Sequence, residues 1–258
     1  MRNLITLCAP STQVGETFHL LLCPFAGGSA NAFRSWKRLS TVDMQVSLAV
    51  YPGRDHRIDE PCLTDINSLA EQVVQELDVA GLDPTRLVVA GHSMGAQVAY
   101  EVCQQLTQRN QPPRGLVLSA CQAPHLQGRN RISHLEDRAF LEQLVKLGGC
   151  APELLNEPTW WPAFMPMLRA DFQATEQYWY ARPPAIPARL TLPTQLVYGS
   201  ADNEAHCSEV AAWQEWLSTD SSGPVAIAGD HFYIIQHPDA FLACIRNWLA
   251  QEVSPSGQ

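Results

Sequence analysis

The sequence predicts an α/β fold, in which a mostly parallel central sheet is covered by helices on both faces. Short apolar segments of strand length alternate along the chain with longer segments whose apolar residues recur at helical spacing. Hydrophobic residues make up 46% of the chain, as expected for strands that are buried on both faces. A chain of 258 residues can bury enough surface for one large core, so we expect a single domain over residues 1–258.

Strands and helices are predicted to alternate from one end of the chain to the other. Residues 1–10 are expected to form an edge strand or a loose end, because their apolar stretch is too short for a signal peptide. Further strands are expected at Phe18–Cys23, Met44–Val50, Leu87–Ala90, Leu116–Ala120, Leu192–Tyr198 and Pro224–Ala228. Helices are expected near Asn31, from Asp65 to about Leu77, after Ser93 to about Leu106, at Glu136–Leu147, Thr159–Tyr180 and Glu204–Leu217, and over the C-terminal stripe Phe241–Leu249.

The segment from about 125 to 190 interrupts this alternation, because it contains helical patterns and no convincing strand. Its second helical run is apolar on more than one face, so protein or substrate must cover it. An insertion of this kind near the carboxyl edge of the sheet predicts a lid that gates access and excludes water. We expect Trp161, Met165 and Phe172 of this lid to contact substrate. The alternative is a helical cap that only completes the core.

Ser93 lies in the most informative motif of the chain, the G-x-S-x-G of residues 91–95. The motif follows a predicted strand and precedes a predicted helix, which is the context of a nucleophile elbow. Glycine is expected on both sides of Ser93, because a neighbouring helix or strand would collide with a side chain there. The turn exposes the Ser93 hydroxyl. It also places the N–H of Met94, at the positive end of the helix, near a developing oxyanion.

A serine nucleophile needs a base and a group that orients the base, and candidates for both lie downstream. Asp202 follows the strand that ends near Tyr198, and His231 follows the strand that ends near Ala228. The chain order Ser93, Asp202, His231 is that of the α/β-hydrolase sheet. We therefore expect an α/β-hydrolase with a Ser-His-Asp triad.

Local roles compete with the catalytic interpretation at these positions. Asp202 could simply cap the helix that is predicted to begin at Glu204, since Asp is a favoured N-cap residue. Asp230 is the rival carboxylate for His231, but adjacent side chains leave a turn in different directions, and a solvated loop position suits it better. His92, inside the elbow, is expected to pack or hydrogen-bond locally.

A second oxyanion donor is expected from the loop after the strand Phe18–Cys23. This loop, Pro24–Ser29, contains two glycines, which allow the backbone to approach a bound acyl group closely. The N–H of Phe25 or of Ala26 is expected to act with that of Met94, and the sequence leaves the choice between the first two open. Seen alone, the loop would equally suit an ordinary glycine turn.

Composition excludes several other functions. The net charge of −9 makes nucleic acid an unsuitable partner. The eight cysteines include no C-x-x-C pair, and they are expected to be small core residues in a reducing compartment. No His/Cys cluster has metal-ligand spacing, no G-x-x-x-x-G-K is present, and no segment approaches the length of a membrane span. We expect a cytoplasmic monomer that needs no metal or other cofactor.

Several motifs occur in a specific order along nearly the whole chain, from about Thr17 to Leu249. They are Pro24–Ser29, Tyr51–Arg54, Gly91–Ala96, Leu147–Gly149, Leu168–Phe172 with Tyr178 and Tyr180, and His231–Phe232. In these motifs the chain resembles the type II thioesterases that accompany nonribosomal peptide and polyketide synthases. It is most similar to members that serve siderophore-type assembly lines. Asp230 departs from the pattern, because many members have Gly before the histidine, which affects the local electrostatics of His231.

The resemblance implies hydrolysis of acyl groups that are wrongly or unproductively attached, as thioesters, to the phosphopantetheine arm of a carrier domain. The implied partners are acylated carrier domains of a synthase. Three alternatives stay open: a thioesterase that releases a finished product, a general carboxylesterase or peptidase, and a catalytically idle hydrolase fold that binds a partner. The last would be indicated by a lost triad residue, and all three residues are present.

Overall fold

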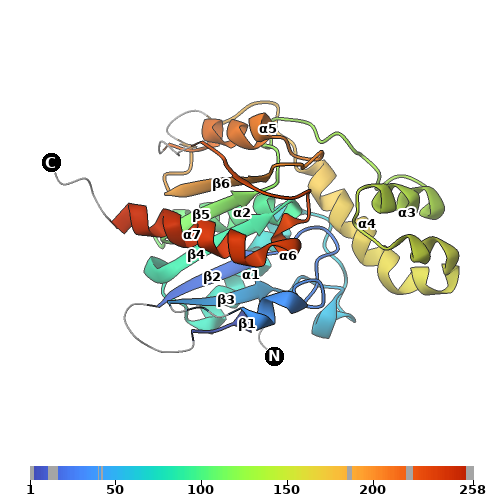
Figure 1. Ribbon diagram of the computed structural model, residues 1–258, viewed down its shortest axis with the longest axis horizontal. Helices are drawn as coiled ribbons and strands as arrows, with labels where there is room; N and C mark the ends of the chain where they lie inside the picture. The colour runs from blue at the N-terminus through green and yellow to red at the C-terminus, as the bar shows by residue number, and fades with distance from the viewer. Residues whose placement is uncertain are drawn as a thin grey trace.

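A seven-stranded sheet forms the centre of the part of the chain that the computed structural model describes, residues 3–10, 17–39, 41, 43–184, 188–218 and 223–253 (Figure 1). The strand order is β1-β3-β2-β4-β5-β6-β7, and only β1 is antiparallel to its neighbour. The strands are β1 (Leu4–Cys8), β2 (Phe18–Cys23), β3 (Met44–Ala49), β4 (Leu87–His92), β5 (Gly115–Ser119), β6 (Thr194–Gly199) and β7 (Val225–Ile227). The mostly parallel sheet is confirmed, and residues 4–8 form the edge strand.

Helices cover both faces of the sheet, as predicted. In Figure 1, α7 crosses the front of the sheet, and α1 and α2 lie behind it. The α-helices are α1 (Ile66–Ala80), α2 (Met94–Gln108), α3 (Asp137–Lys146), α4 (Trp161–Gln177), α5 (Cys207–Ala211), α6 (Tyr233–Gln236) and α7 (Pro238–Val253). No helix in the described ranges has the length and apolar character needed to cross a membrane.

Alternate residues of the central strands enter two different cores, because side chains of a strand point to opposite faces. Leu20 of β2 pairs with Val88 of β4, and both pack in the core beneath α7. Leu21 and Val89, the next pair along, belong to the core beneath α1 and α2. All four side chains are fully buried. Each contributes about 1.5–3 kcal/mol through the burial of its apolar surface.

The bounds of α1 follow from its sequence. Asp65 accepts a 2.8 Å hydrogen bond from the N–H of Ser68 and so caps the first turn. Gly81 ends the helix with φ of 63°, a left-handed conformation that glycine adopts without strain. Between these ends, the predicted apolar stripe from Ile66 to Leu77 is buried.

The predicted insertion is helical and lies to one side of the sheet. In Figure 1, α3 and α4 extend beyond the sheet, with the N-terminal end of α4 farthest from it. Together with short 3₁₀ segments, these helices enclose an apolar cluster of their own, centred on Phe140, Leu141 and Met165. We call residues 125–184 the lid. Residues 185–187 of the predicted insertion lie outside the described ranges.

Two predicted helices are shorter than expected. Near Asn31 the chain forms turns and then the 3₁₀ helix Arg34–Arg38, which buries Trp36. The helix predicted at Glu204–Leu217 is limited to α5 and the following 3₁₀ helix Ala212–Trp216.

Candidate active site

Ser93 occupies the sharp turn between β4 and α2. Its φ of 55° and ψ of −124° are costly for any residue except glycine, and strain of this kind costs about 1–3 kcal/mol. A Cβ atom on Gly91 would lie 1.9 Å from the carbonyl oxygen of Gly95, and one on Gly95 would lie 2.0 Å from that of Cys23. The two glycines are therefore required by close backbone contacts, as the motif predicted.

The elbow lies at the carboxyl ends of β2 and β4, where the strand order reverses. From β2 the chain passes to β3 on one side of the sheet, and β4 returns on the other side. Open α/β sheets bind ligands in the crevice that such a reversal creates.

His231 connects Ser93 with Asp202. Its Nε2 lies 3.0 Å from Oγ of Ser93, and its Nδ1 lies 2.9 Å from Oδ2 of Asp202. The three residues come from the loops after β4, β6 and β7, as the sequence predicted. The contacts form the continuous relay needed to pass a proton from a serine hydroxyl to an imidazole that a carboxylate orients.

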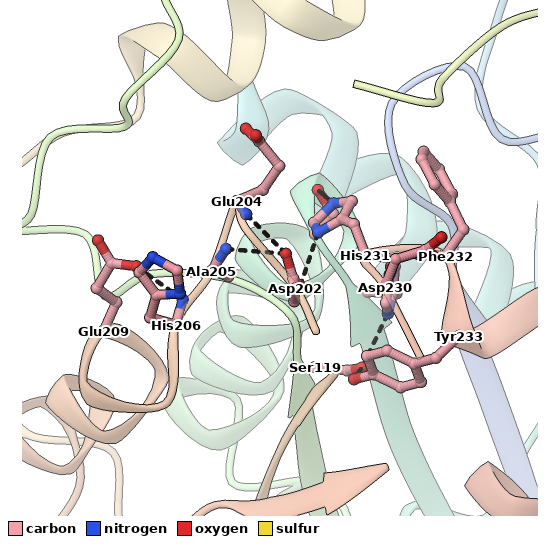
Figure 2. Close-up of polar contacts among 12 residues, drawn as sticks. Ser119, Asp202, Glu204, Ala205, His206, Glu209, Asp230, His231, Phe232 and Tyr233 are labelled. Atoms are coloured by element: carbon pink, nitrogen blue, oxygen red, sulfur yellow. Dashed lines mark hydrogen bonds and ion pairs between the residues drawn. The ribbon is translucent and has the colours of Figure 1, made fainter. Parts of the chain in front are cut away.

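Asp202 is held on both sides. Its Oδ1 accepts hydrogen bonds from the N–H groups of Glu204 at 2.7 Å and Ala205 at 3.1 Å, while its Oδ2 faces His231 (Figure 2). Burial alone would raise the pKa of this carboxyl, but the hydrogen bond and charge of His231, together with the two N–H groups, lower it. Asp202 therefore stays ionised, and it both caps the following turn and contacts His231.

Asp230 has a local structural role. Its carboxylate accepts a 2.8 Å hydrogen bond from the N–H of Phe232 and contacts the side-chain amide of Gln236. Its side chain is exposed. The rival interpretation of Asp230 as the partner of His231 is thus not supported by the geometry.

His92 fixes the backbone of His231, a contact that the sequence did not reveal. Its Nε2 lies 2.7 Å from the carbonyl oxygen of His231, and since a carbonyl only accepts, Nε2 carries the proton. Burial, followed by the nearby His231, lowers the pKa of His92 to about 3, so its Nδ1 is an acceptor. That Nδ1 lies 2.9 Å from Oγ of Ser119, which in turn contacts the hydroxyl of Tyr233. His92 therefore hydrogen-bonds, but with partners on other elements and not locally as the sequence predicted.

A cavity of ≈ 110 Å³ opens beside Ser93 and His231. Phe25, Ala26 and Met94, the predicted sources of oxyanion donors, all line it. Met94 is the first residue of α2, so its N–H has no acceptor within the helix. Cys121 also lines the cavity; burial raises the pKa of its thiol.

Of the three lid residues expected at the substrate, only Phe172 lines this cavity. Trp161 and Met165 belong to the apolar cluster within the lid, and the indole N–H of Trp161 donates to the carbonyl of Leu154 at 2.8 Å. Leu168, four residues before Phe172 and therefore on the same face of α4, lines the cavity instead. Trp161 and Met165 pack within the lid cluster and do not line the cavity, whereas Phe172 packs its ring on Phe140 of α3 and also lines the cavity.

A second cavity of ≈ 250 Å³ adjoins the first, and Gln122, Gly128, Asn130 and Thr175 line both. Its other walls include the side-chain amides of Gln97, Gln127 and Gln177. Such a wall can donate hydrogen bonds to, and accept them from, amide groups of a ligand. Among the residues that the structure describes, no group of three or more His, Cys, Asp or Glu side chains is arranged to hold a metal ion.

Comparison with known proteins shows similarity along almost the whole chain. Residues 18–249 match the family model of the thioesterase domain. The sequence is 43% identical over 246 residues to the probable anguibactin biosynthesis thioesterase AngT of Vibrio anguillarum, covering 95% of this chain and 97% of the relative.

Solved structures agree with the sequence comparison. YbtT, a type II thioesterase from the yersiniabactin NRPS/PKS biosynthetic pathway, matches with a TM-score of 0.89 and 42% identity, over 98% of this chain and 100% of that protein. RedJ, a thioesterase from the prodiginine biosynthetic pathway in Streptomyces coelicolor, matches with a TM-score of 0.78 and 31% identity, over 94% and 95% of the two chains.

Proposed function

The chain belongs to the thioesterase domain family, and from this premise we propose that it is a type II, editing thioesterase. It is a hydrolase that acts on thioesters. Its proposed substrates are acyl groups wrongly or unproductively attached to the phosphopantetheine thiol of carrier domains. The observation that carries the proposal is the hydrogen-bonded relay of Ser93, His231 and Asp202 at the cavity.

In the proposed acylation step, His231 accepts the hydroxyl proton while Ser93 Oγ attacks the thioester carbonyl. The carbonyl oxygen becomes an oxyanion, which accepts hydrogen bonds from the N–H of Met94 and from that of Phe25 or Ala26. Collapse of this intermediate breaks the C–S bond, and the pantetheine sulfur leaves as a thiol with the proton from His231. The acyl group stays on Ser93 as an oxygen ester.

In the proposed deacylation step, His231 takes a proton from water, which attacks the ester carbonyl. The second tetrahedral intermediate uses the same N–H groups and collapses to the free acid, and His231 returns the proton to Ser93. Asp202, kept ionised by its hydrogen bonds, stabilises the imidazolium in both steps. A thioester is already activated, so this machinery suffices without a cofactor.

The two adjoining cavities support a carrier-bound substrate. The ≈ 110 Å³ cavity beside Ser93 has room for a short acyl group, such as an editing enzyme would remove. The ≈ 250 Å³ cavity presents the amide side chains of Gln97, Gln127 and Gln177, which are complementary to the two amide groups of a pantetheine arm. A thioester lying across the junction would have its carbonyl at Ser93.

The proposed partners are carrier domains of a siderophore-type assembly line. AngT is named for anguibactin biosynthesis, and YbtT comes from the yersiniabactin NRPS/PKS pathway. We further propose that the protein acts in the cytoplasm as a monomer.

The proposal is tested by mass spectrometry of a carrier domain loaded with acetyl or hexanoyl pantetheine, before and after incubation with the protein. We expect loss of the acyl mass with the wild-type protein and none with Ser93→Ala. An acyl carrier that stays intact would refute the thioesterase proposal. Faster hydrolysis of a matched oxygen ester than of the carrier thioester would indicate a carboxylesterase. Activity only on a finished, full-length product would indicate a releasing enzyme.

A further inference from the structure

Two motifs that the proposed mechanism does not use, Tyr51–Arg54 and Leu168–Phe172, meet beside the oxyanion loop. Arg54 follows β3, whereas Asp171 lies in lid helix α4, 117 residues further along the chain. Nη1 of Arg54 donates to Oδ2 of Asp171 at 2.7 Å, and Nη2 donates to Oδ1 at 2.6 Å. The side chains are 3% and 1% exposed, so this is a buried, bidentate ion pair.

The same ion pair holds the backbone of the oxyanion loop. Oδ2 of Asp171 accepts a 2.7 Å hydrogen bond from the N–H of Gly27, and Nη1 of Arg54 donates to the carbonyl of Gly28 at 3.3 Å. The N–H of Gly28 donates back to the carbonyl of Phe25 at 2.8 Å, which closes a turn over residues 25–28. Gly27, the third residue of that turn, has φ of 77°, as in a type II turn.

Lid helix α4 also packs directly on this turn. A Cβ atom on Gly27 would lie 2.6 Å from Cδ2 of Leu168, so the helix packs closely on the loop at this glycine. Leu168 and Asp171 are three residues apart and therefore share one face of α4. This end of the lid thus contacts the turn that carries Phe25 and Ala26 through both an apolar and a charged side chain.

Stability alone does not explain this arrangement. In a buried ion pair, the attraction between the two charges offsets the cost of removing them from water. Apolar residues of similar volume in their place often stabilise a fold equally well. Burial would lower the pKa of Arg54, but the charge and hydrogen bonds of Asp171 raise it, so the guanidinium stays charged. A carboxylate fixed by Arg54 does what an apolar side chain cannot, because it accepts the Gly27 N–H in one orientation.

We propose that Asp171 and Arg54 are positioning residues for the oxyanion hole, through which the lid helix holds the turn of residues 25–28 in its catalytic geometry. This inference rests on the proposed function, because it assumes that the N–H of Phe25 or Ala26 stabilises the oxyanion. The turn contacts the oxyanion only as charge develops, so its displacement lowers kcat and leaves KM unchanged.

Two double variants separate the hydrogen bond from the ion pair. Arg54→Met with Asp171→Leu removes both charges and the acceptor for the Gly27 N–H, whereas Arg54→Met with Asp171→Asn removes the charges but keeps an amide oxygen as acceptor. For the first we expect kcat for an acetyl carrier thioester to fall about 10²-fold, as when one oxyanion donor is lost. For the second we expect a loss of less than about tenfold, because the turn is still held.

The control is Asp137→Asn, which removes the negative charge from another Arg–Asp pair of the lid, between Asp137 of α3 and Arg169 of α4 at 2.6 Å. Its kcat should equal that of the wild type. If the Leu variant does not fold by circular dichroism, Arg54→Lys replaces it: the charge remains, the bidentate geometry is lost, and kcat should fall about tenfold. Equal kcat values for the Leu and Asn double variants, or an unchanged kcat for Arg54→Lys, would overturn the inference.

A fluorophosphonate separates failure of this inference from failure of the proposed function. Ser93 Oγ forms a bond to phosphorus, fluoride leaves, His231 takes the hydroxyl proton, and the phosphoryl oxygen lies in the oxyanion hole. Whatever the natural substrate is, the labelling rate should be reduced more in the Leu double variant than in the Asn double variant. A wild-type protein that is labelled but hydrolyses no carrier thioester would refute the proposed function alone. Equal labelling of all the variants would refute the positioning role.

Discussion

Replacing Phe172 with Ala should shift the acyl preference towards longer chains. Phe172 is one of the lid residues that line the ≈ 110 Å³ cavity beside Ser93, and truncation of its ring enlarges that cavity. Each further methylene that is buried there contributes about 0.8 kcal/mol, or about fourfold in kcat/KM. With room for two more methylenes, the ratio of kcat/KM for hexanoyl over butanoyl carrier thioester should rise about 15-fold, as measured by release of the free carrier thiol.

Trp161→Ala is the control, because Trp161 packs within the lid and does not line the cavity. It should lower the free energy of unfolding by about 2 kcal/mol, roughly half the cost for a fully buried aromatic residue, and leave the hexanoyl to butanoyl ratio unchanged. The reasoning would be refuted if Trp161→Ala changed the ratio and Phe172→Ala did not. That result would place the acyl group inside the lid cluster.

Ser93→Ala should fold normally and lose about 10⁶-fold in kcat, measured with an acyl carrier thioester; near-normal turnover would exclude an acyl-enzyme on Ser93. Asp202→Asn should lower kcat by about 10⁴-fold through the wrong tautomer of His231, whereas Asp230→Asn should lower it little; the reverse ranking in the same assay would mean that Asp230 is the orienting acid. His92 has a pKa of about 3 in the folded protein and about 6.5 when unfolded, so the unfolded chain binds one more proton between these values. The free energy of unfolding should therefore decrease as the pH falls through this window, by up to about 1.4 kcal/mol per pH unit from His92; in urea unfolding at pH 5 to 7, His92→Asn should reduce this slope, and an unchanged slope would contradict the assignment.

The triad could be predicted because each of its residues follows a strand with a recognisable pattern. Ser93 lies between glycines that close backbone contacts require, and Asp202 and His231 lie in the loops after the two strands that follow the lid. A parallel sheet brings the carboxyl ends of its strands to one edge, so strand order in the sequence was enough to place the three side chains together.

Contacts that depend on how helices pack could not be predicted in this way. The helical pattern at Thr159–Tyr180 is apolar on more than one face, so the sequence did not show which of its residues line the cavity and which pack only within the lid. The ion pair between Asp171 and Arg54 joins segments that are 117 residues apart. No pattern in the sequence relates one of these residues to the other. The His92–Ser119–Tyr233 contacts likewise join three separate elements.

Cys121 places a thiol in the wall of the cavity in which we propose that the thioester binds. A thiolate there would exchange with the substrate and take the acyl group as a new thioester, in competition with Ser93. Burial raises the pKa of this thiol, and its Sγ lies 3.4 Å from the carbonyl oxygen of Gln122, an acceptor for the S–H. At neutral pH the sulfur therefore stays protonated and a poor nucleophile. In the proposed reaction the acyl group would therefore be transferred to the Ser93 oxygen, and no cysteine thioester would accumulate in the enzyme.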